Sequence, residues 1–303
     1  MKGSSFMVTS LQRKHHRNAA VQSASKTTVS MVLLLVMAFY FLLPLYWLLV
    51  SMTKSTEQLF STPMLTFPDQ LHFFSNLKWL HTHQGGVFWQ WVVNSVIYAG
   101  GAALLGTLIS AMAGYAIAMY TFRGKRPLFL AVLGSLMVPA AAMTIPIFLL
   151  VKALGLIDTY AGVILPMLVQ PFGVYFMLVY IKETMPRELI DSGRVDGCSD
   201  FGIFFRIALA IIRPGLATLF LIIFISTWNN FFLPLVLLSK MELFPLTVGL
   251  QIWMANLNTA GAGEPLYPLI LIGAFLSILP MLILFPLLRK YIVSGIAMGS
   301  IKS

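Results

Sequence analysis

The sequence contains few charged residues. Asp, Glu, Lys and Arg together make up 10% of the 303 residues, whereas about a quarter is usual in a soluble domain, and apolar residues make up 58%. This composition excludes an ordinary cytosolic fold. The chain also has a single cysteine, Cys198, so that it offers no pair of thiols for a disulfide or for redox chemistry.

Motifs for binding phosphates or metals are missing as well. No Gly-x-x-x-x-Gly-Lys-Ser/Thr motif is present, and the nearest stretch, Gly101–Gly106, continues with Thr107 in place of the lysine that reaches phosphates. We therefore expect no ATP hydrolysis by this chain. His72, His81 and His83 share a short segment without a nearby cysteine or carboxylate cluster, which favours a surface loop over a metal site.

Long apolar runs are abundant. A helix of about 20 apolar residues crosses a bilayer, and runs of this length must be helical because lipid cannot hydrogen-bond to exposed backbone. The predicted fold is therefore all-α, a polytopic membrane protein with six transmembrane helices at Val29–Val50, Val92–Ala118, Leu128–Val151, Ala161–Ile181, Leu216–Leu238 and Leu266–Leu288. Several prolines are expected to kink these helices, namely Pro139, Pro146, Pro166, Pro171, Pro234, Pro280 and Pro286.

The ends of the chain are predicted to be tails. The polar, basic residues 1–28 form a flexible or surface-lying tail, and 289–303 form a second one, on either side of a transmembrane domain over 29–288. The first apolar run is too long for a signal peptide and lacks a small-residue cleavage site after it. It is therefore expected to remain as the first membrane helix.

The net charge of +10 is explained by membrane orientation. If both termini are cytoplasmic, the outer segments contain only four of the 20 basic residues, namely Lys54, Lys78, Lys152 and Lys240. Acidic residues are divided evenly between the two sides, and a bias of cations without a bias of anions is typical of membrane topology. We therefore predict cytoplasmic termini and no binding of nucleic acid.

The predicted cytoplasmic segment Lys182–Asp200 is the one richest in charge. Glu188 and Asp191 stand where the first turn of a helix would favour acids, because the positive end of the helix dipole lies there. Gly193 and Gly197 permit a turn or a close approach of another backbone. The segment is predicted to be a rigid, charged elbow that docks on a polar partner, although a solvated connecting loop would have the same composition.

This segment resembles the loop signature of the membrane permease subunits of binding-protein-dependent ABC importers, in particular the maltose-transporter-type branch for carbohydrates. The signature is Glu-Ala-Ala, three residues, Gly, nine residues and Ile-x-Leu-Pro. Here Asp191-Ser192-Gly193 is followed at the same spacing by Gly197 and by Ile207–Ala210, so that Asp, Ser-Gly and a final Ala depart from the pattern. The resemblance extends from about residue 30 to the C-terminus and includes Asn94–Ile97, Ala113–Ala118 and Trp228–Pro234.

The resemblance implies a channel-forming permease subunit of an ATP-driven importer in a prokaryotic cytoplasmic membrane, which translocates a sugar delivered by an extracytoplasmic solute-binding protein. The implied partners are a second permease subunit and two nucleotide-binding ATPase subunits, which would bind ATP and Mg, whereas this chain would hold no cofactor and no catalytic residue. In this family the loop, here 182–212, forms a coupling helix that docks on the ATPase. The expected coupling residues are Glu188, Asp191, Gly193, Arg194, Asp196 and Gly197.

Two further expectations follow from this comparison. Arg194 and the acids are expected to contact the ATPase, and Gly197 to allow its close approach. The tail 290–302 resembles a C-terminal extension that in some members reaches between the ATPase subunits, and a frayed terminus is the alternative.

Neutral polar residues are the candidates for the substrate pathway, namely Gln170, Ser226, Thr227, Trp228, Asn229 and Asn230. Amides can hydrogen-bond sugar hydroxyls and an indole can stack on a sugar ring, although packing between membrane helices explains the same residues. No Asp, Glu, Lys or Arg falls within the predicted spans, which argues against a secondary carrier. A carrier or channel without an ATPase is nevertheless the alternative function, and a membrane-embedded enzyme is disfavoured by the absence of acid–base or nucleophile groupings.

Overall fold

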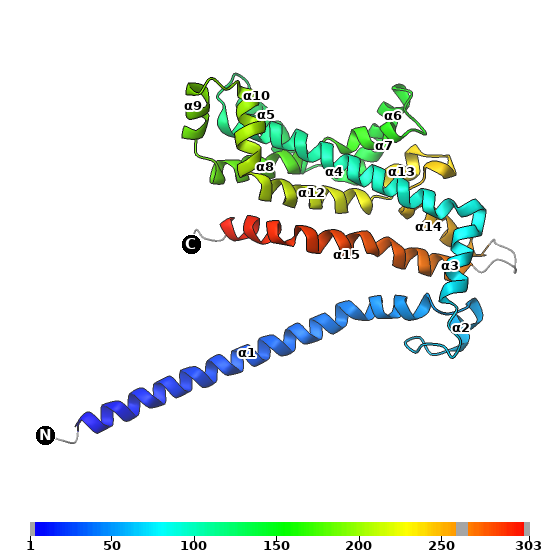
Figure 1. Ribbon diagram of the computed structural model, residues 1–303, viewed down its shortest axis with the longest axis horizontal. Helices are drawn as coiled ribbons and strands as arrows, with labels where there is room; N and C mark the ends of the chain where they lie inside the picture. The colour runs from blue at the N-terminus through cyan, green and yellow to red at the C-terminus, as the bar shows by residue number, and fades with distance from the viewer. Residues whose placement is uncertain (1–3, 259–265, 300–303) are drawn as a thin grey trace. The chain divides into compact units, whose positions relative to one another are not determined.

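The structure is a computed structural model that describes the backbone of residues 4–258 and 266–299 (Figure 1). The described residues form helices and turns, with no strand among them, which confirms the all-α prediction. The chain divides into two units, Met1–Phe73 and Phe74–Ser303.

The first unit contains α1 (Ser4–Ser51) and α2 (Thr56–Ser61). The stretch Thr27–Ser51 of α1 is long and apolar enough to cross a membrane, and it contains the predicted first span. The backbone is helical from Ser4 onward, where a flexible or surface-lying tail was predicted. After α1, a capping box of Ser55 and Gln58 starts α2, since each side chain accepts a hydrogen bond from the other's backbone N–H.

The remaining helices belong to the second unit, apart from Phe73 at the start of α3. In chain order they are α3 Phe73–Thr82, η1 His83–Gly86, α4 Val87–Met119, α5 Lys125–Leu136, η2 Ala140–Met143, α6 Thr144–Ala153, α7 Tyr160–Met167, α8 Pro171–Thr184, α9 Glu188–Val195, α10 Asp200–Ile203, η3 Phe204–Ala208, α11 Leu209–Ile211, α12 Arg213–Trp228, α13 Phe232–Leu237, η4 Met241–Leu243, α14 Leu246–Ala255, η5 Asn256–Asn258 and α15 Leu266–Gly299.

Helix α4 is the central helix of this unit. It packs along both α8 and α12, and α12 also packs against α15, so that these helices lie side by side (Figure 1). Small residues allow the close approach of α4 to α8, because Gly106, Ser110 and Gly114 recur every fourth residue on one face. A Cβ atom on Gly114 would lie 2.8 Å from the backbone nitrogen of Leu178, which leaves no room for a larger side chain.

Three of the six predicted spans are broken in the structure. The predicted helix Leu128–Val151 consists of two parts that are bent by 103°, and the predicted helix Ala161–Ile181 is bent by 42°. Prolines explain both positions, because Pro139 precedes η2 and Pro171 begins α8, and proline has no N–H to continue the preceding helix. Among the residues that the structure describes, three helices are long and apolar enough to cross a membrane, and up to six spans result if each of three bent pairs counts as one.

The predicted fifth span, Leu216–Leu238, is also wrong as a single helix. Helix α12 ends at Trp228, and α13 begins after a short break. At this break the side-chain oxygen of Asn230 accepts a hydrogen bond from the backbone N–H of Leu233. An asparagine at a helix start offers the backbone this alternative partner, which favours interruption of the helix.

Two features near the C-terminus differ from the prediction. The short apolar helix α14 was not expected, and α15 continues through Leu288 as far as Gly299, where a tail was predicted. Residues 300–303 and the side chains of 288–299 lie outside the described parts of the chain, and so do the contacts of the predicted tail 290–302.

Candidate functional site

The charged segment between α8 and α12 forms an amphipathic helix, α9. Its exposed face carries Glu188, Asp191, Ser192 and Val195, which are spaced by three or four residues and therefore lie on one side of a helix. On the opposite side Ile190 and Gly193 are buried. The valine is 88% exposed, so that an apolar side chain stands among acidic neighbours with nothing from this chain covering it.

The end of α9 explains Gly197. Its φ angle is 77°, in the left-handed region, and its N–H donates to the carbonyl of Arg194 at 3.0 Å while the N–H of Cys198 donates to the carbonyl of Gly193 at 2.9 Å. These two bonds and the left-handed glycine form a Schellman motif, which ends a helix. A Cβ atom on Gly197 would meet no atom of this chain within 4 Å. Within the chain, therefore, backbone conformation requires this glycine.

Close packing instead involves Gly193. A Cβ atom there would lie 3.0 Å from Cγ1 of Ile203 and 3.3 Å from Cδ1 of Ile207. The glycine thus lets α9 lie directly against α10 and η3, which lead into α12. From the sequence, both glycines were expected to permit a turn or a close approach. In the structure Gly193 is required by close packing and Gly197 by its left-handed backbone conformation.

Arg194 faces other parts of the same chain. Its Nη2 atom donates to Oδ1 of Asp200 at 3.2 Å, and its guanidinium carbon lies 5.7 Å from the ring centroid of Tyr120. The hydrogen bond to Asp200 raises the pKa of Arg194, and burial raises the pKa of the Tyr120 hydroxyl. Asp196, the C-cap of α9, is exposed. Asp200 was not among the predicted coupling residues, although Ser199 before it is a recognisable helix cap whose Oγ accepts from the N–H of Gly202.

The predicted pathway residues do not form one cluster. Ser226 and Asn229 are exposed, whereas Thr227 and Trp228 are buried. The indole of Trp228 stacks on Phe224 at 5.7 Å between ring centroids. It therefore packs within this chain, where no sugar ring could stack on it in this conformation.

The amides among these residues mainly support helix ends. Gln170 lies in the break between α7 and α8 and donates through Nε2 to the carbonyl of Met167 at 2.8 Å. Asn229 donates through Nδ2 to the carbonyl of Ile225 at 2.9 Å. Asn230 accepts at its side chain from α13 and at its carbonyl from the hydroxyl of Thr247, at 2.9 Å. Interhelical and local packing thus accounts for most of this set.

A polar network near the N-terminal end of α4 was not predicted. Asn94 of α4 donates through Nδ2 to the carbonyls of Glu242 at 2.7 Å and Phe244 at 3.0 Å, and its Oδ1 accepts from the hydroxyl of Tyr160 at 2.7 Å. On the same face of α4, Trp91, Ser95 and Tyr98 also hydrogen-bond the backbone of 241–246, with distances of 2.8–2.9 Å. The adjacent Asn94 and Ser95 in a mainly apolar helix were the feature of the sequence that could have indicated this network.

Asp158 connects the turn before α7 with the segment 237–240. Its φ angle is 56°, and its Oδ1 atom accepts from the N–H groups of Ser239 at 2.5 Å and Lys240 at 3.2 Å. Its own N–H donates to the carbonyl of Leu237 at 3.1 Å. The turn before α7 is therefore tied to the segment that follows α13.

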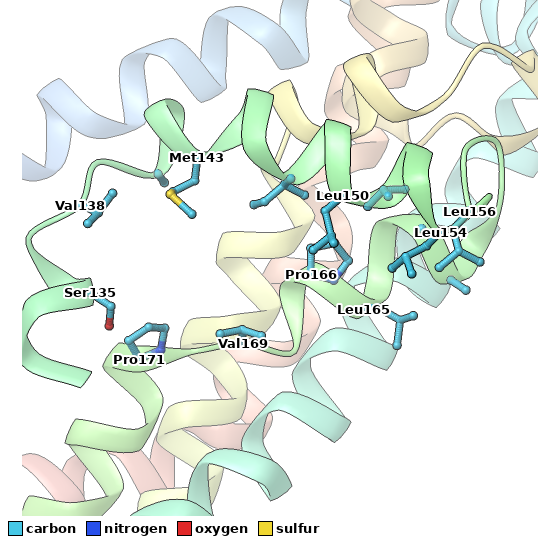
Figure 2. Close-up of a pocket in the computed structure, with 15 residues that line it drawn as sticks. Ser135, Val138, Met143, Leu150, Leu154, Leu156, Leu165, Pro166, Val169 and Pro171 are labelled. Carbon is cyan, nitrogen blue, oxygen red and sulfur yellow. The ribbon is translucent and has the colours of Figure 1, made fainter. Parts of the chain in front are cut away.

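An apolar cavity of about 550 Å³ lies between the α5–α6 break and α7 (Figure 2). Every lining side chain except that of Ser135 is apolar, and the lining includes Val138, Leu150, Leu165 and Val169. Next to it, Met137 is 85% exposed. Such a lining offers almost no partner for sugar hydroxyls and suits another apolar surface.

A surface loop was predicted for all three histidines; His72 does lie in the non-helical stretch before α3, whereas His81 and His83 do not lie in a loop. His81 belongs to α3, and its Nδ1 accepts from Nε1 of Trp89 at 3.0 Å. His83 is buried, with its ring 5.3 Å from that of Trp253. Within the described residues, no group of three or more His, Cys, Asp or Glu side chains is placed to hold a metal ion.

The chain is similar to a known protein family and to individual members of known function. Residues 106–298 match the family described as binding-protein-dependent transport system inner membrane component. The chain is 34% identical over 269 residues to the arabinooligosaccharides transport system permease protein AraQ of Bacillus subtilis (strain 168), covering 88% of this chain and 93% of that protein. It is 32% identical to the lactose transport system permease protein LacG of Rhizobium radiobacter, with coverages of 88% and 92%.

A solved structure is similar over most of its length. It is described as the crystal structure of a bacterial ABC transporter involved in the import of the acidic polysaccharide alginate. The similarity has a TM-score of 0.77 at 25% sequence identity and covers 87% of this chain and 95% of the other.

Proposed function

Because the chain belongs to the family of binding-protein-dependent transport system inner membrane components, we propose that it is a channel-forming permease subunit of an ATP-driven sugar importer. Relatives named for arabinooligosaccharides and lactose support a mono- or oligosaccharide as the substrate. The sugar would be delivered by an extracytoplasmic solute-binding protein to the cytoplasmic membrane of a prokaryote. The observation that carries the proposal is the exposed, acidic face of α9.

This face is suited to dock on an ATPase subunit. Glu188 and Asp191 present negative charge, and Val195 presents an apolar side chain one turn further along the same face. A complementary groove would supply cations for the two carboxylates and an apolar socket for the valine. Exposed ion pairs contribute only about 0.2–1 kcal/mol each, whereas full burial of a valine side chain contributes about 1.5–3 kcal/mol. Val195, once it enters the socket, is therefore expected to carry much of the affinity and the acids the orientation.

The proposed cycle needs no catalytic group in this chain. Two ATPase subunits bind ATP and Mg and close on each other, which moves the docked α9. The membrane subunits then open toward the loaded solute-binding protein, and hydrolysis returns them to the inward-facing state. Energy therefore enters this subunit through α9.

A second permease subunit would cover the helix breaks at 137–139 and 168–170. Both breaks lie near the middle of predicted spans, and Met137 and Val169 are 85% and 75% exposed there. Non-helical backbone at membrane depth cannot face lipid, because lipid offers no hydrogen bonds, so that either protein or water must cover it. The apolar lining of the neighbouring cavity favours protein over water.

Chemical labelling tests this arrangement. A lipid-soluble reagent that forms a carbene on illumination labels side chains that face lipid, whatever their chemistry. The peptide around Met137 is expected to be labelled weakly because the second permease subunit covers it, whereas the peptide around Leu282, on the exposed side of α15, is the control that should be labelled strongly. Equal labelling of both peptides would mean that lipid covers the break and would contradict the proposed contact.

The alternative is a carrier or channel that needs no ATPase. Helix α4 contains no Asp, Glu, Lys or Arg, and α12 contains none after Arg213 at its start. Carriers that are coupled to ions or protons usually place such a residue on their pathway. The importer function is therefore the better supported of the two.

The main experiment compares complexes purified in detergent from the native membrane. Wild type is expected to bring down an ATPase subunit, and Val195→Asp is expected to lose most of it because a charge would enter an apolar socket. Phe74→Asp, which alters another strongly exposed apolar residue, on α3, is the control and should retain the subunit. Purification of wild type alone, with sugar uptake that persists without ATP, would establish the carrier function instead.

A further inference from the structure

We propose that Tyr120, Arg194 and Asp200 form a latch that fixes the docking helix α9 to the cytoplasmic end of α4, so that α4 follows α9 when the ATPase moves it. The inference rests on the proposed function and deepens it. Arg194 is then a positioning residue that acts inside this chain, and the contact with the ATPase belongs to the opposite face of α9.

The geometry of α9 separates the two faces. Glu188, Asp191 and Val195 share the outward side, whereas Arg194 lies toward the side of the buried Ile190 and Gly193. From there the guanidinium reaches Asp200 at the start of α10, with 3.2 Å between Nη2 and Oδ1. It also lies over the ring of Tyr120, 5.7 Å from the centroid. One side chain thus contacts both the next helix and the end of α4.

Tyr120 is itself held firmly in place. It is the C-cap of α4, and its N–H donates to the carbonyl of Ala116 at 3.2 Å. Its own carbonyl accepts from Nζ of Lys125, at the start of α5, at 2.8 Å. Its ring packs edge-on against Tyr115, with centroids 5.6 Å apart, and Tyr115 packs against Phe204 of η3 at 5.1 Å. A force on Tyr120 therefore acts on α4 and on the start of α5.

The backbone alone would transmit such a force poorly. Helix α9 is eight residues long, and both of its ends are interrupted, by the non-helical Met185–Arg187 stretch and by the left-handed turn at Gly197. The helix also packs through Gly193 on Ile203 and Ile207, and such apolar packing restrains distance more than direction. The latch adds a directed polar contact to a helix whose backbone connections are short and bent.

The latch also matters because of where α4 leads. Helix α4 packs along α8 and α12, and at its outer end it holds the segment 241–246 through Asn94 and its neighbours. Movement of its cytoplasmic end is thereby conveyed to the outer side. Exposed ion pairs and cation–π contacts are individually weak, so that loss of the latch is expected to reduce coupling by about three- to tenfold without abolishing it.

The test uses the complete transporter in proteoliposomes, with the sugar-loaded solute-binding protein on the outer side. Arg194→Ala is expected to retain the ATPase subunits and the stimulated ATP hydrolysis, but to lower the sugar transported per ATP hydrolysed by about three- to tenfold. Arg194→Lys keeps the charge and should retain part of the wild-type ratio of sugar to ATP. The double variant Arg194→Asp with Asp200→Arg should have a higher ratio than either of its two single variants. Arg187→Ala removes one exposed cation from the start of α9 and is the matched control, with an unchanged ratio.

The possible outcomes discriminate clearly. A loss of co-purified ATPase in Arg194→Ala, like that expected of Val195→Asp, would make Arg194 a partner contact and overturn the latch. An intact complex with an unchanged ratio of sugar to ATP would overturn it as well. Failure of wild type to bind an ATPase, or transport without ATP, would remove the proposed function itself and is visible before any latch variant is compared.

Discussion

Replacement of Gly197 by alanine should loosen the end of α9 for a purely conformational reason. The residue has a φ angle of 77°, and a Cβ atom would meet nothing within 4 Å, so that crowding inside the chain contributes nothing. The left-handed conformation costs an L-residue about 1–2 kcal/mol. A cost of this size changes the ratio of closed to open helix end by a factor of about 5–30.

Hydrogen exchange measured by mass spectrometry on the purified transporter provides the assay. The amides of residue 197 and Cys198 close the Schellman motif, and they should exchange about 5–30 times faster in Gly197→Ala than in wild type. Gly124, at the N-cap of α5, also has a positive φ and open space around it. Gly124→Ala is therefore the matched control, with a similar strain but unchanged exchange in α9.

Substitution of Gly197 by asparagine distinguishes two reasons for the glycine, namely its left-handed backbone conformation and a close approach of the ATPase subunit. Asparagine tolerates the left-handed region, so that Gly197→Asn should recover most of the protection that alanine loses. Unchanged exchange in Gly197→Ala would refute the conformational argument. Restored protection in Gly197→Asn combined with loss of the ATPase subunit would show that close approach of the partner also requires the glycine.

Three further changes test the packing that supports the site. Gly114→Leu should lower the melting temperature of the purified complex, because its Cβ atom would lie 2.8 Å from the backbone of α8, whereas Gly100→Leu has open space and should not. Asn94→Ala should destabilise by about 1–3 kcal/mol in denaturant titrations, since two carbonyls lose their donor, and an unchanged midpoint would contradict this. Asp158→Ala should increase proteolysis after α13, where two backbone N–H groups lose their acceptor, and Asp158→Asn should restore most of the resistance.

Much of the fold could be predicted because membrane insertion depends on local properties. The lengths of the apolar runs matched the thickness of a bilayer, and each run became helical over most of its length, since lipid leaves the backbone few other ways to satisfy its hydrogen bonds. The elbow at 182–212 was also recognisable from its charge and glycines, and α9 formed within it. The roles of the pathway candidates could not be predicted in the same way, because polar side chains in a span can face a substrate, cap a helix break or join two helices, as Asn230 does.

By itself, therefore, the sequence determined that this protein is helical, that it crosses a membrane and that it contains a charged elbow between two predicted spans. Composition and run length suffice for these conclusions, because they depend on the solvent around each segment. Only the tertiary structure decided where the spans break, why Gly193 and Gly197 are both glycine, and which way Arg194 faces. These features depend on what packs against each residue, and Asp200 and Tyr120, which hold Arg194, lie six and 74 positions away along the chain.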